Sequence, residues 1–467
     1  MTHLTLSDFE RDALPTLTQY ASIPCLSPAF DAAWSENGYI DQAMELLANW
    51  VREREFNDVE IEIHRIEGRT PLMTVTIGAT NPGEGTCVLY GHMDKQPPLG
   101  DWSEGLAPYQ PVRRGDRLYA RGVADDGYST FAAILALEAM EREGIGHSRC
   151  VVLIEASEES GSPDLDAYLD LLKAQLGRVE LMICLDSGAL TYDRLWVTTS
   201  LRGVINIELT VSVLEYGQHS GSASGVIPSS FRILRQLLER VEDSSTGDIL
   251  IPELYGEIPE YVKDSAEEVA REFGDVLARE LPALEGLKLM GSSAADRIVR
   301  RTWHPTLSVV GMAGIPDPSI AGNVLRPFTS AVLSFRVPPN IDANKAGQAV
   351  IKALTENVPS NARVEASFLT GEGWVAPELA PWLAAALDQG SIEAFGRKPG
   401  FTGEGGSIPF LGELAKRYPE VQFVATGVLG PQSNAHAIDE MLDLPTAVGV
   451  TNAVVTILTA HAQSKES

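Results

Sequence analysis

Hydrophobic residues recur with two different periods in the first part of the chain. Apolar residues three or four positions apart predict helices over residues 7–22 and 38–54, and another helix is expected after residue 127. Strict alternation predicts strands, and continuous apolar runs are typical of strands that helices bury on both faces. The expected strands lie at residues 59–63, 72–76, 86–90, 151–154 and 181–185.

The pattern changes near residue 200. Residues 204–211 alternate between apolar and polar, so one face of this strand is expected to be covered and the other exposed. The order strand, helix, strand, strand, helix, strand then indicates a ferredoxin-like α+β domain, and α/β character returns at residue 377. The expected segments are strands at 204–211, 306–311, 329–337 and 362–369, helices at 230–241, 343–356, 379–395 and 444–460, and an acidic insertion with prolines at 243–300.

Together these segments predict an α/β fold with a second domain inserted into it. At 467 residues the chain is too long for one hydrophobic core, since domains average roughly 150 residues. We expect residues 1–200 and 373–467 to form a mainly parallel sheet with helices on both faces. Residues 201–372 are expected to form the inserted α+β domain.

Charge and composition narrow the class of protein. The chain has 36 Lys and Arg against 64 Asp and Glu, and its net charge of −28 repels nucleic acid and anionic membranes. No apolar stretch is seen to approach the roughly 20 residues that span a bilayer, and residues 1–8 do not resemble a signal peptide. The four cysteines are scattered and look like core residues. We therefore expect a cytoplasmic protein without nucleic-acid or membrane partners.

Side chains that could bind metal follow several of the predicted strands. His92 and Asp94 come directly after the apolar run that ends at Tyr90, and side chains two positions apart on a strand point the same way. Taken singly, such residues also serve in turns, helix caps and hydrogen-bonded pairs. Carboxylates gathered at one sheet edge raise one another's pKa, which a pair of divalent cations would relieve. The other residues at strand ends are Asp125, Asp126, Glu158, Glu159, Asp186 and His436.

Five short motifs, in order along the chain, resemble the ligand motifs of a known enzyme family. They are Gly91–Asp94, Ala124–Gly127, Ser157–Ser162, Asp186–Ser187 and Ala435–His436. The chain resembles the di-zinc exopeptidase and aminoacylase family, which includes carnosine dipeptidases, glutamate carboxypeptidases and succinyl-diaminopimelate desuccinylases. Segments 158–162 and 403–409 look most like the cytosolic non-specific dipeptidase branch. The resemblance implies a di-zinc exopeptidase-like catalytic domain and an inserted lid and dimerisation domain.

The resemblance also implies two divalent metal ions. One would be held by His92 and Asp186, the other by Glu159 and His436, and Asp125 would bridge them. Imidazole nitrogen and carboxylate oxygen suit Zn²⁺ above all, with Mn²⁺ or Co²⁺ as alternatives.

Further roles follow from the same resemblance. Asp94 would orient His92, and Glu158 would be the general base that activates a metal-bridging water. His219 matches a histidine that stabilises the oxyanion, usually across a dimer interface. The implied substrate-binding residues are Asn323, Arg336 and Ser407.

Two motifs depart from the family pattern. The usual G-H-x-D-V-Q-P has Lys95 at the valine position, and the usual D-D-K-G reads Asp125-Asp126-Gly127-Tyr128. Lysine has left one motif and is present in the other. We hypothesise a charge-compensating exchange close to the metals, which a Lys95 side chain directed away from the site would rule out.

These features predict a di-metal amide hydrolase that acts as a dipeptidase on small peptides, as a homodimer through the lid domain. One alternative is an N-acyl-amino-acid deacylase of the desuccinylase type, which has the same metal core. The other is a non-catalytic peptide-binding homologue, against which Glu158 argues because binding needs no general base. The sequence leaves the substrate and the physiological metal open.

Overall fold

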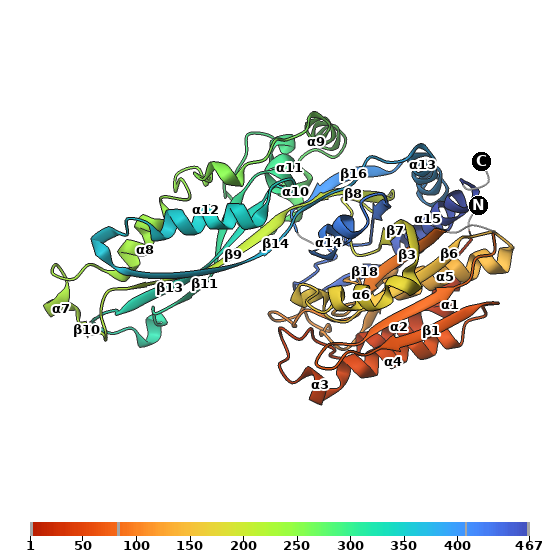
Figure 1. The fold of residues 1–467 in the computed structure, drawn as a ribbon, viewed down its shortest axis with the longest axis horizontal. Coiled ribbons are helices and arrows are strands. Elements are labelled where there is room, and N and C mark those ends of the chain that lie inside the picture. The colour runs from red at the N-terminus through yellow and green to blue at the C-terminus, as the bar shows by residue number, and fades with distance from the viewer. Residues whose placement is uncertain (1–2, 82–84, 407–408, 465–467) are drawn as a thin grey trace. The chain divides into compact units, whose positions relative to one another are not determined.

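A computed structural model describes residues 3–81, 85–406 and 409–464 (Figure 1). By its internal contacts the chain divides into two units. The first contains residues 1–199, 376–402 and 414–467, and the second contains residues 200–375 and 403–413. Most of the second unit is therefore inserted into the first along the sequence.

The first unit contains a mixed sheet whose middle strands are parallel. β3 (Gly85–His92) has a parallel neighbour on each side, β6 (Arg149–Glu155) and β7 (Arg178–Cys184), and β17 (Gln422–Ala425) adds to β7 in the same direction. Within the first unit the strand order is β1-β2-β6-β3-β7-β17-β8, which confirms the predicted fold class. The outer strands are β1 (Val59–His64), β2 (Leu72–Ile77) and β8 (Trp196–Leu201). Along the chain, β15 (Trp374–Val375) belongs to the second unit, and β16 (Gly400–Glu404) begins in the first unit and ends in the second.

The middle strands are buried on both faces, as their continuous apolar sequences predict. On β3, Leu89 belongs to a core that it shares with α5 (Ser129–Glu143) and α15 (Leu444–Gln463). Its neighbour Val88 points to the opposite face and is buried as well. Helix α6 (Leu165–Leu176) lies over that second face (Figure 1).

The helix predicted over residues 7–22 is in fact two helices. α1 (Leu6–Asp12) and α2 (Leu14–Ala21) meet at Ala13. Pro15 stands in the first turn of α2, where a missing N–H is tolerated, whereas a continuous helix would lose a hydrogen bond there. The other helices of the first unit are α3 (Trp34–Asn37), α4 (Tyr39–Arg52) and α13 (Pro381–Phe395), and α14 (Pro409–Arg417) crosses from one unit to the other along the chain.

One helix is long and apolar enough to span a membrane, so the expectation that no such stretch exists was wrong. This helix is α15, and 83% of its most apolar window is buried inside the protein. Its apolar residues pack in the core with α5 and α13. Length and composition therefore describe a core helix here as well as they would describe a membrane span.

The second unit contains a four-stranded antiparallel sheet in the order β11-β13-β9-β14. Buried and less buried residues alternate along β9 (Gly203–Ser212), and α8 and α12 pack on the buried side. This order confirms the predicted ferredoxin-like arrangement. The remaining elements of the sheet and its cover are β11 (Thr306–Ala313), β13 (Phe328–Val337), β14 (Arg363–Gly371), α8 (Ser230–Leu238) and α12 (Ala343–Thr355).

Smaller elements complete both units. In the second unit, the acidic segment expected at residues 243–300 forms three α-helices. They are α9 (Glu260–Phe273), α10 (Val276–Glu280) and α11 (Ala294–Trp303). At one end of its sheet lie β10 (Gln218–His219), α7 (Ser220–Ala223) and β12 (Val324–Leu325) (Figure 1). In the first unit a small sheet has the order β18-β5-β4, formed by β4 (Val112–Arg114), β5 (Arg117–Tyr119) and β18 (Met441–Asp443).

Candidate metal centre

The candidate site lies in the first unit, at the carboxyl end of its parallel strands. His92 is the last residue of β3, Glu158 and Glu159 follow β6, and Asp186 follows β7. Since these three strands are neighbours, the residues that follow them meet at one edge of the sheet. The strand-end pattern in the sequence thus corresponds to a cluster in space.

The imidazole of His92 is buried and faces two carboxylates. Its Nε2 lies 3.5 Å from Oδ1 of Asp125 and 3.7 Å from Oδ2 of Asp186. On the other side of the ring, Nδ1 lies 3.2 Å from the backbone oxygen of Asp94 and 3.5 Å from its Oδ1. The contacts of Nδ1 hold the ring so that Nε2 is presented to Asp125 and Asp186.

Asp94 also fixes the turn that carries the two glutamates. Its Oδ1 accepts a hydrogen bond from the backbone N–H of Glu158 (3.1 Å), and its Oδ2 accepts one from that of Glu159 (3.0 Å). These N–H groups begin the short helical turn η1 (Glu158–Ser160), where intrahelical partners are lacking. One carboxylate therefore positions both His92 and the Glu158–Glu159 turn.

His436 joins the cluster from a loop after β17. Its φ of 61° is uncommon for a residue other than glycine. Its Nε2 lies 2.8 Å from Oδ2 of Asp125 and 3.2 Å from Oε2 of Glu159, and Gln96 donates to the same Oε2 at 2.8 Å. Asp125 thus faces His92 with one oxygen and His436 with the other, which is the placement expected of a bridging ligand.

The pKa values of the carboxyl groups in the cluster indicate that their negative charge has to be balanced by positive charge. Burial works to raise the pKa of Asp125, but the neighbouring imidazole groups of His436 and His92 lower it overall. Burial raises the pKa of Glu158 well above its ordinary value, and the carboxylates of Asp186 and Glu159 add to the increase. Divalent cations are the usual way in which proteins hold so many carboxylates together.

The geometry fits metal ions. Nε2 of His92 and Oε1 of Glu159 are buried and make no hydrogen bond within the described part of the chain. Ligand atoms at about 2.1 Å from a tetrahedral ion lie roughly 3.4 Å apart, close to the separations of Nε2 from Asp125 and Asp186. Two groups could each hold an ion: His92 with Asp125 and Glu159, and His92 with Glu158 and Asp186. The second group places the expected base, Glu158, within reach of a metal ligand.

The expected substrate residues belong to the second unit. His219 and Asn323 lie together, because β10 pairs with β12 and the N–H of Ser220 donates to the backbone oxygen of Asn323 (2.8 Å). His219 is exposed. Arg336 is half-buried on β13. Ser407 lies outside the described residues.

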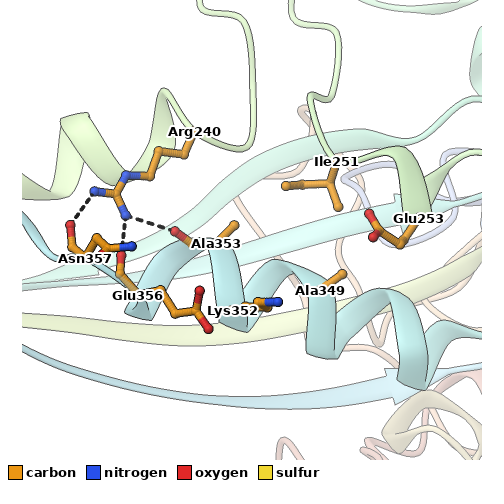
Figure 2. A pocket seen from close by; sticks show the side chains of 8 residues that line it. All are labelled: Arg240, Ile251, Glu253, Ala349, Lys352, Ala353, Glu356 and Asn357. Carbon is orange, nitrogen blue, oxygen red and sulfur yellow. Dashed lines mark hydrogen bonds between the residues drawn. The ribbon is translucent and has the colours of Figure 1, made fainter.

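A hollow of about 370 Å³ in the second unit does not involve any of these residues (Figure 2). Arg240 lines it and donates to the backbone oxygens of Ala353, Glu356 and Asn357 at 3.1, 2.7 and 2.8 Å. The guanidinium group therefore caps the carboxyl end of α12, which is a structural role.

The side chain of Lys95 points away from the metal cluster. Its Nζ donates to the backbone oxygens of Tyr20 (3.0 Å), Ala21 (3.3 Å) and Ile23 (2.8 Å) and lies 4.2 Å from the centre of the Tyr20 ring. The hypothesis of a charge-compensating exchange beside the metals was therefore wrong. The carbonyl groups at the end of α2 take up the positive charge instead.

The second departure from the family pattern packs near the same tyrosine. A Cβ atom on Gly127 would lie 2.2 Å from the backbone oxygen of Gly122 and 2.3 Å from a ring carbon of Tyr20. No lysine fits at position 127 without displacing Tyr20. Both departures are thus explained by packing between α2 and the loops that carry the ligands.

Several polar residues around the cluster were not predicted from the sequence. Gln96 contacts Glu159, and Arg121 and Glu440 form a buried ion pair of 2.7 Å. Asp126, which was expected at the strand end, accepts from the N–H of His92 at 3.2 Å. Gln96 lies close to predicted ligands in the sequence, so adjacency was a usable signal for it. Arg121 and Glu440 are 319 positions apart, and no local pattern joins them.

Known proteins share both sequence and fold with this chain. It is 27% identical over 374 residues to a cysteinylglycine-S-conjugate dipeptidase of Corynebacterium striatum, covering 78% of each chain. It is 27% identical over 412 residues to a Cys-Gly metallodipeptidase of Saccharomyces cerevisiae, covering 85% of this chain and 83% of the relative.

Solved structures have the same fold. Human carnosine dipeptidase 1 superposes with a TM-score of 0.80 at 20% identity, covering 98% of this chain and 97% of that one. An M20 family metallo-carboxypeptidase of Sulfolobus solfataricus superposes with a TM-score of 0.80 at 21% identity, covering 96% and 99%. A family model matches residues 88–460, which include every residue of the metal cluster. The chain belongs to peptidase family M20/M25/M40.

Proposed function

We propose that this protein is a dipeptidase that hydrolyses the peptide bond of small peptides with two divalent metal ions, Zn²⁺ above all. The observation that carries the proposal is the cluster in which two histidines, His92 and His436, meet four carboxylates. Relatives that match most of the chain are dipeptidases, which supports this substrate class.

His92 and Asp186 would hold one ion, Glu159 and His436 the other, and Asp125 both. The two-sided contacts of Asp125 support this division. When bound, such a pair of ions polarises a carbonyl group and makes a water molecule more acidic. Asp94 would keep the imidazole of His92 in its orientation through Nδ1.

Glu158 would act as the general base. Its backbone is fixed by Asp94, while its carboxylate lies within 4.8 Å of the ligand atoms of His92 and Asp186. From there it would take a proton from the attacking water and pass it to the leaving amine. The contact with Asp94 thus holds the base without using its carboxylate.

Residues of the second unit would bind the substrate. The guanidinium group of Arg336 is suited to a bidentate pair with the terminal carboxylate of a peptide. Asn323 and Ser407 would contribute hydrogen bonds, and His219 would stabilise the oxyanion of the tetrahedral intermediate.

The layout of the second unit supports a homodimer. His219 and Arg336 lie at opposite ends of its sheet, because Arg336 pairs with Val204 at the start of β9 and β10 follows the end of β9. The eight steps along the strand from Phe328 to Arg336 span about 27 Å, which is longer than a dipeptide. One copy can therefore not present both side chains to one substrate from this unit, whereas a second copy could supply His219.

The cysteines support a cytoplasmic location. All four are buried thiols, as expected of core residues in a reducing compartment.

The substrate class is tested by a panel of dipeptides and of N-succinyl and N-acetyl amino acids, each assayed with Zn²⁺, Mn²⁺ and Co²⁺. We expect dipeptide hydrolysis that a chelator abolishes and added metal restores. Hydrolysis of N-succinyl amino acids alone would assign the protein to the desuccinylase alternative. Full activity in the metal-free protein would contradict the metal centre.

The role of Glu158 is tested by Glu158→Gln, which keeps the size of the side chain but cannot take a proton. We expect kcat to fall by about 10²–10⁴-fold, since general bases contribute that much, while two metal ions remain bound. Metal content is measured by elemental analysis of the dialysed protein. Glu53→Gln, at an exposed position after α4, is the matched control and should leave kcat unchanged. Normal turnover in Glu158→Gln would remove the residue from the mechanism.

A further inference from the structure

A buried ion pair joins two loops that carry predicted metal ligands. Nη1 of Arg121 lies 2.7 Å from Oε2 of Glu440, and the two side chains are 1% and 0% exposed. Nη2 of Arg121 donates to the backbone oxygen of Ala437 at 2.6 Å. Ala437 directly follows His436. Arg121 therefore contacts the loop that carries His436 at two residues, Ala437 and Glu440.

The carboxylate of Glu440 also binds the backbone that leads into Asp125. Its Oε2 accepts from the N–H of Gly122 at 2.9 Å, and its Oε1 accepts from the N–H groups of Ala124 (3.1 Å) and Asp125 (3.2 Å). With the bond from Arg121, one buried carboxylate receives four hydrogen bonds. Hydrogen bonds to a charged group are stronger than neutral ones, and burial strengthens them further. The carboxylate of Glu440 therefore restricts the positions of the groups that it binds.

A short ladder extends this connection. β5 and β18 are antiparallel partners, and the N–H of Ala120 donates to the backbone oxygen of Glu440 at 3.1 Å. The His436 loop is closed by a hydrogen bond of 2.9 Å from the N–H of Met441 to the backbone oxygen of Ser433. The chain segment before Asp125 and the chain segment after His436 are thus hydrogen-bonded to each other at several positions.

We infer that Arg121 and Glu440 are positioning residues that set the spacing between Asp125 and His436. They would thereby set the metal affinity of the position formed by Glu159 and His436, a statement that rests on the proposed metal centre. The other position would share Asp125 but take its remaining ligands, His92 and Asp186, from the ends of β3 and β7, which pair directly in the main sheet. Loss of the Arg121–Glu440 pair should therefore weaken the position of Glu159 and His436 more than the other.

The test is Zn²⁺ binding to the full-length protein, measured by competition with a chromogenic chelator. Glu440→Gln keeps the shape of the side chain but removes its charge. We expect one of two ions to bind about 10–100-fold more weakly, the usual effect of losing a residue that supports metal ligands, and the other to be weakened less. The matched control is Glu10→Gln, which removes a part-exposed ion pair with Arg113 in the same unit and should change neither affinity.

A second variant identifies which ion is affected. His436→Ala removes the ligand itself, so adding Glu440→Gln to it should cause a smaller loss of affinity than Glu440→Gln causes in the wild type. An equal loss in the double variant would show that the pair does not act through the spacing of His436 and would overturn the inference. Equal weakening of both ions in Glu440→Gln would do the same, because it would assign the pair a role in overall stability.

Arg121→Lys covers the case in which Glu440→Gln does not fold. It keeps the buried positive charge but cannot reach both Glu440 and Ala437, so the same ion should bind more weakly. Unchanged affinity for both ions in the folded Arg121→Lys variant would overturn the inference. A wild-type protein that binds fewer than two ions would instead contradict the proposed metal centre.

Discussion

Glu155 is a buried carboxyl group directly below the turn that carries Glu158. It ends β6 and accepts hydrogen bonds from the hydroxyl groups of Tyr90 and Ser162, the latter at 2.8 Å. Burial raises its pKa from 4.5 to about 7, although the two hydroxyl groups work in the opposite direction. Between these two pH values the folded protein therefore holds a proton on Glu155 that the unfolded chain has lost.

This proton makes stability depend on pH. The contribution of Glu155 is fully present below about pH 4.5 and is lost as the pH rises through 7, because the ionised carboxylate is poorly solvated in the folded state. Glu155→Gln resembles the protonated form and does not titrate. We expect the wild type to lose roughly 3 kcal/mol relative to this variant between pH 5 and pH 8. Urea unfolding at pH 5, 6, 7 and 8 measures the difference.

The control for this prediction is Glu53→Gln, whose carboxyl group is exposed. Its unfolding free energy should run parallel to that of the wild type over the same pH range. If Glu155→Gln also ran parallel to the wild type, the raised pKa of Glu155 would be refuted.

Individual residues could be predicted from the sequence where the backbone alone decides their place. His92 and Asp186 meet because neighbouring parallel strands end together, and that rule needs only the apolar runs before them. The direction of Lys95 could not be predicted, because it depends on where the end of α2 lies in space. The same holds for Glu440, whose partners come from a loop far away in the sequence.

At the scale of elements, the type of a segment was easier to predict than its limits. The middle strands and the strands of the inserted sheet are present as expected, since their apolar patterns match burial on two faces and on one face. The break between α1 and α2 was missed although Pro15 marks it. Helical spacing continues across the break, so periodicity alone does not reveal it.

Strand β11 has one edge that no other strand pairs with in the part of the chain that the structure describes. It lies at one side of the sheet of the second unit and exposes Val309, Val310 and Met312. Exposed apolar edge strands tend to pair with another chain. We therefore expect β11 to contribute to the proposed dimer.

Val310→Lys tests this expectation. Val310 is 63% exposed, so a lysine is tolerated in the monomer but adds a like charge to a symmetric interface. We expect the molar mass from light scattering to fall towards that of one chain at micromolar concentration. Leu369→Lys, on the opposite edge strand β14 and 79% exposed, should leave the mass unchanged. A dimer that survives Val310→Lys would place the interface elsewhere.

At the scale of the whole molecule, the insertion could be predicted because each unit has its own element order. The α/β pattern stops near residue 200 and returns later, and the segment between has the order of a ferredoxin-like domain. The membership of residues 403–413 in the second unit could not be predicted. A segment this short has no periodic pattern that distinguishes one unit from the other.

The position of the insertion has a consequence for the order in which the protein is made. Asp186 and His436 lie on either side of the second unit along the chain, and Glu440 follows His436. During synthesis at about 5–20 residues per second, the ribosome therefore completes the proposed ligands His92, Asp125, Glu159 and Asp186 well before the proposed ligand His436 emerges. A nascent chain would carry only part of the proposed centre until the second unit and His436 have been synthesised. We therefore expect peptide hydrolysis to begin only after that point, and a product truncated before His436 to be inactive.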